Sequence, residues 1–229
     1  MGYALALVGV LLFGAGYFLG SRSGRSREAA LKTTLDESLD KLRLVEHELL
    51  RYSAVDPVTG LHTQQHFQEF LEREWRRASR ERRFVSVIMI EVDHFRAFND
   101  RQGKPEGDAC LKSVANAMKP LIHRPSDLIA RYGGAGKFGV VLGATDSKGA
   151  LLLAERLRLA IEHLATPNPA SPTSPTVTAS LGVASVTPDR DAAWQDIELI
   201  AAAERALAHA KEIGRNTVTL DDPENAPQA

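Results

Sequence analysis

The feature that most constrains the fold is an alternation of apolar, strand-like runs with amphipathic helix patterns. The run FVSVIMIEV, residues 84–92, predicts a buried strand, and a helical pattern follows over about residues 107–121. Two shorter runs, LIARY and FGVVL, flank a glycine-rich turn and predict a hairpin. Strands interleaved with helices predict an α/β fold, in which helices cover a sheet.

The same patterns predict the remaining elements of this region. Further helices are expected over about residues 66–82, 148–164 and 197–213, and further strands at residues 176–186 and 216–220. The stretch TPNPASPTSP, residues 166–175, is expected to be a loop because Pro and Ser interrupt regular structure.

Composition excludes several classes of protein. A chain of 229 residues with 44% hydrophobic and 25% charged residues suits one globular domain with an appendage. A net charge of -1 argues against a nucleic-acid partner held by bulk electrostatics, but allows a small anionic ligand. The single cysteine, Cys110, excludes an intrachain disulfide framework and is interpreted as core filling.

The N-terminal residues 3–20 carry no charge, and a helix of about 18 residues covers a hydrocarbon core of about 30 Å. We therefore expect a transmembrane helix. Arg22, Arg25 and Arg27 follow, and the positive-inside rule then predicts a single-pass inner-membrane protein whose domain faces the cytoplasm. A cleaved signal peptide is less favoured, because the run lacks a positive n-region and an A-x-A-like site.

Residues 28–51 carry Leu and Val at spacings of three and four, which predicts an amphipathic helix. Its apolar stripe either pairs with a second copy as a coiled-coil stalk or packs on its own domain. The expected organisation is an anchor with its basic flank (1–27), a helical stalk (28–52), one domain (53–220) and a disordered tail (221–229).

Five ordered blocks resemble a known family. They are DPVTGL (56–61), EVDHFRAFNDRQGKPEGD (91–108), RYGG (131–134), TASLGVA (178–184) and AKEIGRN (210–216). Together they resemble the signature blocks of GGDEF domains, the diguanylate cyclase family, over about residues 53–220. The resemblance implies a palm-like domain with a central mixed sheet flanked by helices. It also implies a homodimer that joins two GTP molecules into cyclic di-GMP with Mg²⁺.

The metal site that the resemblance implies is incomplete in this sequence. Glu91 matches the first acidic ligand. The hairpin that should carry the second reads Gly133, Gly134, Ala135, Gly136, Lys137 and Phe138. It has one residue too many and no carboxylate, whereas Mg²⁺ prefers carboxylate oxygens. We therefore expect a degenerate signature with no catalytic residues and no required cofactor, Mg²⁺ being needed only if residual GTP binding or cyclase activity exists.

Two interpretations of this hairpin remain open: a flexible tip, or a Lys137 that contacts phosphate in place of the metal. Other substrate positions match the family. Asn99 and Asp108 match residues that bind the guanine base, and Lys211 and Arg215 match residues that reach the phosphates. Alternatively, Asn99 and Asp108 only cap or turn the chain.

Arg124 and Asp127 form an R-x-x-D pattern at the offset where the family has its product-binding inhibitory site. Arginine offers a planar fork to phosphate or guanine, and aspartate accepts hydrogen bonds from guanine. Arg158, or alternatively Arg156, is a candidate for a second arginine.

Three hypotheses follow: a catalytically silent receptor of cyclic di-GMP, an active diguanylate cyclase, and a structural module that keeps only the fold. We favour the receptor, because an active cyclase requires a carboxylate that the hairpin lacks. The expected partners are cyclic di-GMP, GTP as a secondary ligand, the membrane, and a second copy or another protein bound through the stalk.

Overall fold

The computed structural model describes residues 54–134, 136–188 and 196–221, all within the unit Ala54–Ala229. The predicted anchor, stalk and tail lie outside these residues, apart from Asp221. None of the helices in the described part of the chain combines the length and hydropathy that a membrane span requires.

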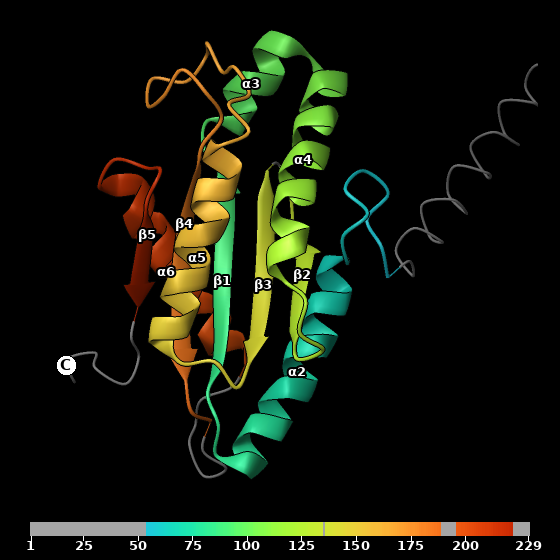
Figure 1. Cartoon of the computed structure of the whole chain (residues 1–229), viewed down its shortest axis with the longest axis vertical. Helices are drawn as coiled ribbons and strands as arrows, with labels where there is room; N and C mark the ends of the chain where they lie inside the picture. Colours follow the sequence, from blue (N-terminus) through green and yellow to red (C-terminus); the bar gives the residue numbers. More distant parts are fainter. Residues whose placement is uncertain (1–53, 135, 189–195, 222–229) are drawn as a thin grey trace, which may run out of the picture. The chain divides into compact units, whose positions relative to one another are not determined.

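A five-stranded sheet forms the centre of the domain (Figure 1). Its strands are β1 (Val85–Val92), β2 (Asp127–Arg131), β3 (Lys137–Gly143), β4 (Ala179–Val186) and β5 (Val218–Asp221), in the order β2-β3-β1-β4-β5. Neighbouring strands run antiparallel except for β4 and β5, which are parallel. The α/β class, the mixed sheet and the predicted β2–β3 hairpin are therefore confirmed.

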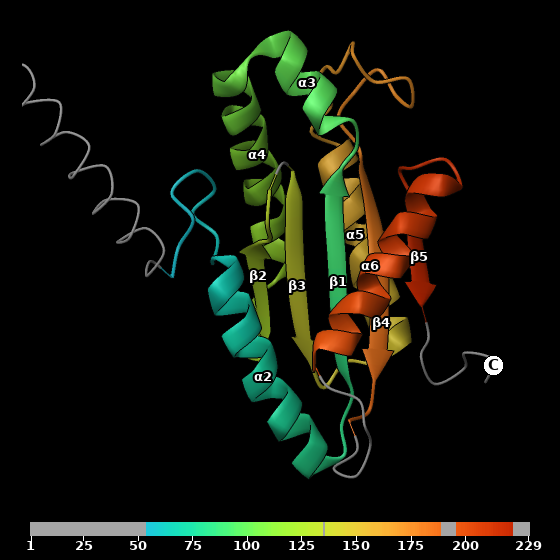
Figure 2. The ribbon, with the colours of Figure 1, turned by 180° about the vertical axis from the view of Figure 1, so that it is seen from behind.

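Helices cover both faces of the sheet. Figure 1 shows α4 (Lys104–Met118) and α5 (Ser147–Glu162) in front of it, with the short α3 (Phe95–Gln102) beyond the end of β1. Figure 2, from behind, shows α2 (Gln64–Glu81) and α6 (Asp196–Glu212) across the other face. A single 3₁₀ turn, Lys119–Leu121, follows α4.

Alternation along β1 divides the core between these two layers. Ile88 and Ile90 belong to the apolar cluster under α4 and α5, whereas Val87 and Met89 belong to the cluster under α2 and α6. A strand covered on both faces is apolar at nearly every position, as the run at residues 84–92 is. Cys110 is buried in the first cluster, which confirms its interpretation as core filling, and burial raises the pKa of its thiol to about 11.

Gly182 lets α6 lie directly on β4. A Cβ atom at this position would lie 2.1 Å from the Leu207 backbone nitrogen and 2.2 Å from the Ala203 carbonyl oxygen. Only a residue without a side chain permits this approach. The close contact brings the C-terminal half of α6 beside the end of β1, where charged residues gather.

Two elements differ from the sequence prediction. The helix α3 was not predicted, because it has only eight residues and two buried side chains, Phe95 and Phe98. The strand expected from residue 176 begins at Ala179 instead. The preceding residues belong to a loop in which Thr176 bridges Pro167 and the Thr178 hydroxyl donates to Asp93.

Candidate functional site

A cavity of about 300 Å³ lies at the C-terminal end of β1. Its lining residues are Glu91, Val92, Asp93, His94, Phe95, Arg96, Lys211 and Arg215. The N-terminus of α3 borders it, where the first-turn N–H groups lack helical partners. Three basic side chains beside a helix N-terminus suit a bound anion such as a phosphate.

Four charged residues form a network beside this cavity, which we call the charge network: Glu91, Lys137, Lys211 and Glu204. The antiparallel register pairs Glu91 on β1 with Lys137 on β3, so their side chains project from the same face. The Lys211 Nζ atom lies 2.6 Å from Glu91 Oε2. The Lys137 Nζ atom donates to both Glu204 oxygens at 3.0 and 2.8 Å and lies 4.0 Å from Glu91 Oε2.

The network unites Glu91, Lys137 and Lys211, which the sequence had singled out separately. Glu204 was missed, although it precedes Lys211 by seven residues, or about two helical turns, and so lies on the same face of α6. Among the described residues, no group of three or more His, Cys, Asp or Glu side chains could hold a metal ion. Both glutamates of the network are already bound to lysines, so this set of donors does not fit Mg²⁺.

Asp93, two residues after Glu91, has a structural role that the sequence analysis also missed. Its buried carboxylate accepts hydrogen bonds from the Thr178 hydroxyl at 2.8 Å, the Ser180 hydroxyl at 2.7 Å and the Asn216 backbone N–H at 3.1 Å. These bonds tie the loop after α6 to the ends of β1 and β4. They thereby hold Arg215, the neighbour of Asn216, at the cavity.

Asn99 and Asp108 lie at the corner between α3 and α4. The Asn99 side chain packs on Gly107, where a Cβ atom would lie only 1.8 Å from Asn99 Oδ1. This oxygen is buried and has no hydrogen-bond partner among the described residues. Gly103, not Asn99 or Asp108, caps both helices, so the capping alternative is not supported.

The glycine-rich hairpin between β2 and β3 uses backbone conformations that favour glycine. Gly133 and Gly136 have φ of +67° and +84°, and a Cβ at Gly136 would lie 3.0 Å from the Cβ of Phe95. Ala135 lies outside the described residues. The Gly136 carbonyl accepts a hydrogen bond from the Val92 N–H at 2.9 Å, which ties the hairpin to β1.

Arg131 fixes the other side of the hairpin. Its guanidinium donates to the carbonyls of Gly134, at 2.8 Å, and Lys137. It lies 5.0 Å from the ring centre of Phe138, a geometry in which cation and ring attract. Phe138 itself is fully buried in the core. The backbone at the start of β3 is therefore held by hydrogen bonds from Val92 on β1 and from Arg131 on β2.

A second cavity, of about 220 Å³, lies between the β2 end of the sheet and α5. Its lining residues are Leu121, His123, Arg124, Asp127, Leu142, Thr145, Gly149, Leu152, Leu153 and Arg156. It unites Arg124 and Asp127 of the R-x-x-D pattern with Arg156. Neither arginine forms an ion pair with a residue that the structure describes, so both guanidinium groups are available to an anion.

Arg158 does not line this cavity. Its guanidinium donates to Glu155, Glu162 and Asn216, and only 12% of its side chain is exposed. Helical spacing explains the difference, because residues two apart on α5 point to different sides of the helix. Arg156, the alternative from the sequence, is the arginine that lies beside Arg124 and Asp127.

The Asp127 carboxyl is half-buried at the edge of this second cavity. Burial raises its pKa, and the Ser126 hydroxyl and the Arg124 charge partly offset that rise. The Asp127 carboxylate, with its raised pKa, offers a hydrogen-bond acceptor, and the two arginines beside it offer positive charge. Such a set can bind a ligand that carries donors and a phosphate together.

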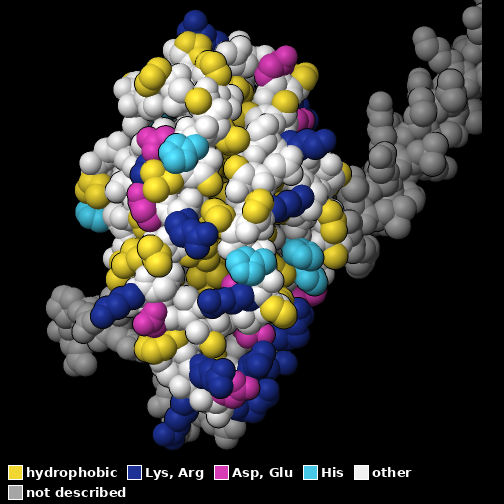
Figure 3. All heavy atoms as spheres, viewed as in Figure 1, with side chains coloured by type: hydrophobic (Ala, Val, Ile, Leu, Met, Phe, Trp, Pro, Cys, Tyr) yellow, Lys and Arg dark blue, Asp and Glu magenta, His cyan; other side chains and the backbone are white. Residues whose placement is uncertain are grey.

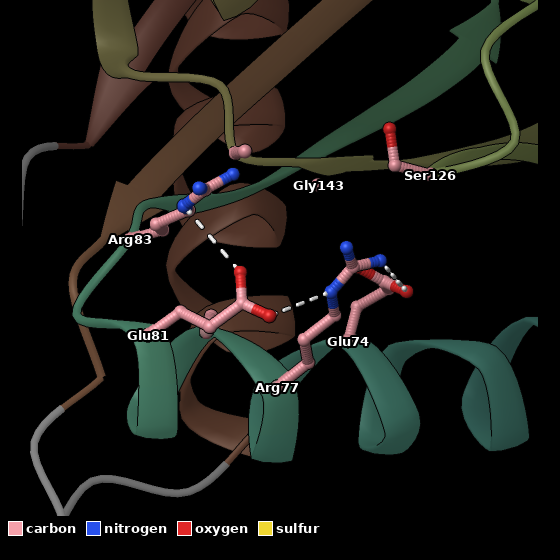
Figure 4. Close-up of a pocket in the computed structure, with 8 residues that line it drawn as sticks. Glu74, Arg77, Glu81, Arg83, Ser126 and Gly143 are labelled. Atoms are coloured by element: carbon pink, nitrogen blue, oxygen red, sulfur yellow. Dashed lines mark hydrogen bonds and ion pairs between the residues drawn. The ribbon is translucent and has the colours of Figure 1, made fainter.

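A third cavity, of about 120 Å³, lies at the C-terminal end of α2 (Figure 4). Figure 4 shows Glu81 between Arg77 and Arg83. Its carboxylate lies 3.1 Å from the Arg77 Nε atom and 3.4 Å from the Arg83 Nε atom, and Arg77 also pairs with Glu74. Figure 3 shows Lys and Arg side chains gathered near this end of α2. Because the charges of the cavity neutralise one another, it is a weaker candidate than the other two.

Comparison with known proteins gives a consistent result. Residues 53–217 match the family described as "Diguanylate cyclase, GGDEF domain". The chain is 39% identical over 170 residues to the probable diguanylate cyclase DgcT of Escherichia coli (strain K12), covering 74% of this chain and 36% of that protein. It is 32% identical over 195 residues to diguanylate cyclase A of Treponema denticola, covering 84% and 50%. The chain thus spans about a third to a half of these curated relatives.

Solved structures share the fold. The GGDEF domain of DgcB from Caulobacter crescentus, in complex with c-di-GMP, matches with a TM-score of 0.65 and 25% identity, covering 73% of this chain and 93% of that one. Diguanylate cyclase SiaD of Pseudomonas aeruginosa, in complex with its activator SiaC, matches with a TM-score of 0.63 and 27% identity, covering 95% and 86%.

Proposed function

The chain belongs to the GGDEF family, and from this premise we propose that it is a catalytically silent, membrane-anchored receptor of cyclic di-GMP. The observation that carries the proposal is the convergence of Arg124, Asp127 and Arg156 on one cavity, while the hairpin near Glu91 offers a lysine instead of an acid.

Catalytic silence follows from the chemistry that the family performs. A hydroxyl must attack an α-phosphate, and divalent metals neutralise the triphosphate and acidify the attacking group. The described hairpin residues carry no carboxylate, and Lys137 adds a positive charge 4.0 Å from the one acid that matches a family ligand. We therefore interpret the signature as degenerate.

Cyclic di-GMP recognition is supported by the donors and acceptors of the second cavity. Arg124 and Arg156 offer planar forks to phosphate or to the O6 and N7 atoms of guanine. The Asp127 carboxylate accepts from the N1 and N2 donors of guanine. Leu152, 67% exposed at the rim, supplies an apolar surface for a base. The related DgcB domain is a c-di-GMP complex.

Calorimetry on the full chain tests the binding site. Arg124→Ala removes a charge-assisted contact of about 1.5–3 kcal/mol, so the affinity for cyclic di-GMP should fall about tenfold or more. Arg101→Ala, an exposed arginine on α3, is the matched control and should keep wild-type affinity. Equal affinity in wild type and Arg124→Ala would exclude this site. A wild type without affinity would favour a structural module.

The alternative of an active cyclase is tested separately. Purified protein with GTP and either Mg²⁺ or Mn²⁺ should form no cyclic di-GMP, because the hairpin lacks its acidic ligand. Product above the background of a heat-inactivated sample would overturn the proposed silence. This assay is independent of the binding measurement.

The membrane anchor is also part of the proposal. It rests on the uncharged residues 3–20 and the three arginines that follow them. A C-terminal reporter should be active in the cytoplasm. A reporter that is active only in the periplasm would contradict this topology. Through the predicted stalk, the domain would then meet a second copy or another protein at the membrane.

A further inference from the structure

The charge network pairs its members crosswise between the sheet and α6. Lys211 on α6 binds Glu91 on β1, while Lys137 on β3 binds Glu204 on α6. Lys137 also approaches Glu91 to 4.0 Å, so its ammonium lies between two carboxylates. Two convergent carboxylates are an arrangement that commonly binds a divalent cation.

We propose that the Lys137 ammonium replaces a divalent cation between Glu91 and Glu204, and that the adjoining cavity binds the phosphates of a nucleotide without metal. The proposal shares with the proposed function the idea of a silent cyclase, but does not depend on cyclic di-GMP binding. It concerns the cavity at the end of β1, whereas Arg124 and Asp127 line a different one.

The position of Lys137 is fixed by its backbone. Its carbonyl accepts hydrogen bonds from the Tyr132 N–H, at 3.0 Å, and from the Arg131 guanidinium, while the strand register holds it opposite Glu91. Only 27% of its side chain is exposed, and Glu204 binds its ammonium through both oxygens. A cation that entered between the two glutamates would have to displace this lysine and would be repelled by it.

The cavity keeps unpaired positive charge after these pairings. Arg96 and Arg215 line it and form no ion pair with the described residues. The negative charge of Asp93 is already stabilised by three hydrogen-bond donors. With the α3 N-terminus beside them, these arginines can neutralise phosphate oxygens, the task that a bound metal otherwise performs.

The first test measures the affinity of the full chain for Mn²⁺ by calorimetry. Lys137→Glu replaces the ammonium by a third carboxylate and should bind Mn²⁺ at least tenfold more tightly than wild type. Lys112→Glu makes the same charge change at an exposed position of α4 and should match wild type. A wild type that binds one Mn²⁺, with that binding lost in Glu91→Gln, would overturn the proposal even if Lys137→Glu failed to fold.

The second test measures GTP affinity in EDTA and in excess Mg²⁺. The affinity of the wild type for GTP in EDTA should agree within threefold with its affinity in excess Mg²⁺. Arg215→Ala should weaken GTP binding in EDTA at least fivefold. Absence of GTP binding in EDTA, or a tenfold gain on adding Mg²⁺, would overturn the proposal. Cyclic di-GMP affinity of the same samples separates the two hypotheses, because it tests only the site of Arg124 and Asp127.

Discussion

Lys137 on β3 donates hydrogen bonds to both carboxylate oxygens of Glu204 on α6, at 3.0 and 2.8 Å. The two residues are 67 positions apart, and their ion pair ties the start of the hairpin strand to the helix that covers it. Lys137 also stands opposite Glu91. The same side chain therefore helps to determine both the stability of this end of the sheet and the charge beside the cavity at the end of β1.

A double-mutant cycle should reveal this coupling. Both side chains are about 30% exposed, 27% for Lys137 and 32% for Glu204, so solvent screens the pair only in part. We expect a coupling free energy of about 1 kcal/mol between Lys137→Met and Glu204→Gln, measured by urea unfolding. Strictly additive effects would mean that the ion pair contributes nothing to the free energy of unfolding.

Arg156 and Arg158 should respond in opposite ways to truncation. Arg156→Ala should weaken cyclic di-GMP binding about fivefold or more, because it removes a cation that lines the cavity with Arg124. Arg158→Ala should leave that affinity unchanged and lower the free energy of unfolding by about 1–2 kcal/mol, because three polar partners lose a donor. Calorimetry and urea unfolding on both variants measure these effects. A loss of affinity in Arg158→Ala with none in Arg156→Ala would contradict the assignment of Arg156 to the cavity.

The strands and long helices could be predicted because their patterns reflect burial on both sides of one sheet. The run at residues 84–92 became β1, and the LIARY and FGVVL runs became β2 and β3. The helix α3 could not be predicted, since eight residues give only about two turns of periodicity. Its position at the cavity depends on tertiary contacts, among them the close approach of Phe95 to Gly136 of the hairpin.

At the end of β1, several site residues were predictable because they matched ordered blocks. Glu91, Lys211 and Arg215 were found in this way and lie together, whereas Glu204 belongs to none of the blocks quoted. Its role depends on the close packing of α6 on β4, which no local pattern of charges encodes. The choice between Arg156 and Arg158 likewise needed three-dimensional information, namely the direction of each side chain on α5.

Gly182→Ala should test the packing that builds the network. The added methyl would meet the backbone of α6 at 2.1 and 2.2 Å, so the helix must shift. We expect a loss of about 2–3 kcal/mol in the free energy of unfolding, the upper part of the range for overpacked cores. Gly134→Ala, where an added Cβ meets nothing within 4 Å, is the matched control and should change stability little. Equal unfolding midpoints in the two variants would contradict this explanation.

The affinity for cyclic di-GMP should fall in acid at a higher pH than an ordinary aspartate would cause. In the proposed complex, guanine donors bind the ionised Asp127 carboxylate, so the ligand lowers its pKa, whereas burial raises that pKa in the free protein. Affinity is therefore constant above the free-state pKa and falls as pH drops through it, by at most about tenfold per pH unit.

The other charged or titratable groups that line this cavity are His123, Arg124 and Arg156, so a variant that keeps all three isolates the contribution of Asp127. Asp127→Asn keeps these groups and removes only the titrating carboxyl. It should bind more weakly at neutral pH but lose no further affinity in acid. If both proteins lose affinity in parallel between pH 7 and pH 4, Asp127 does not contact the ligand as a carboxylate, and the guanine would have to be held by the two arginines alone.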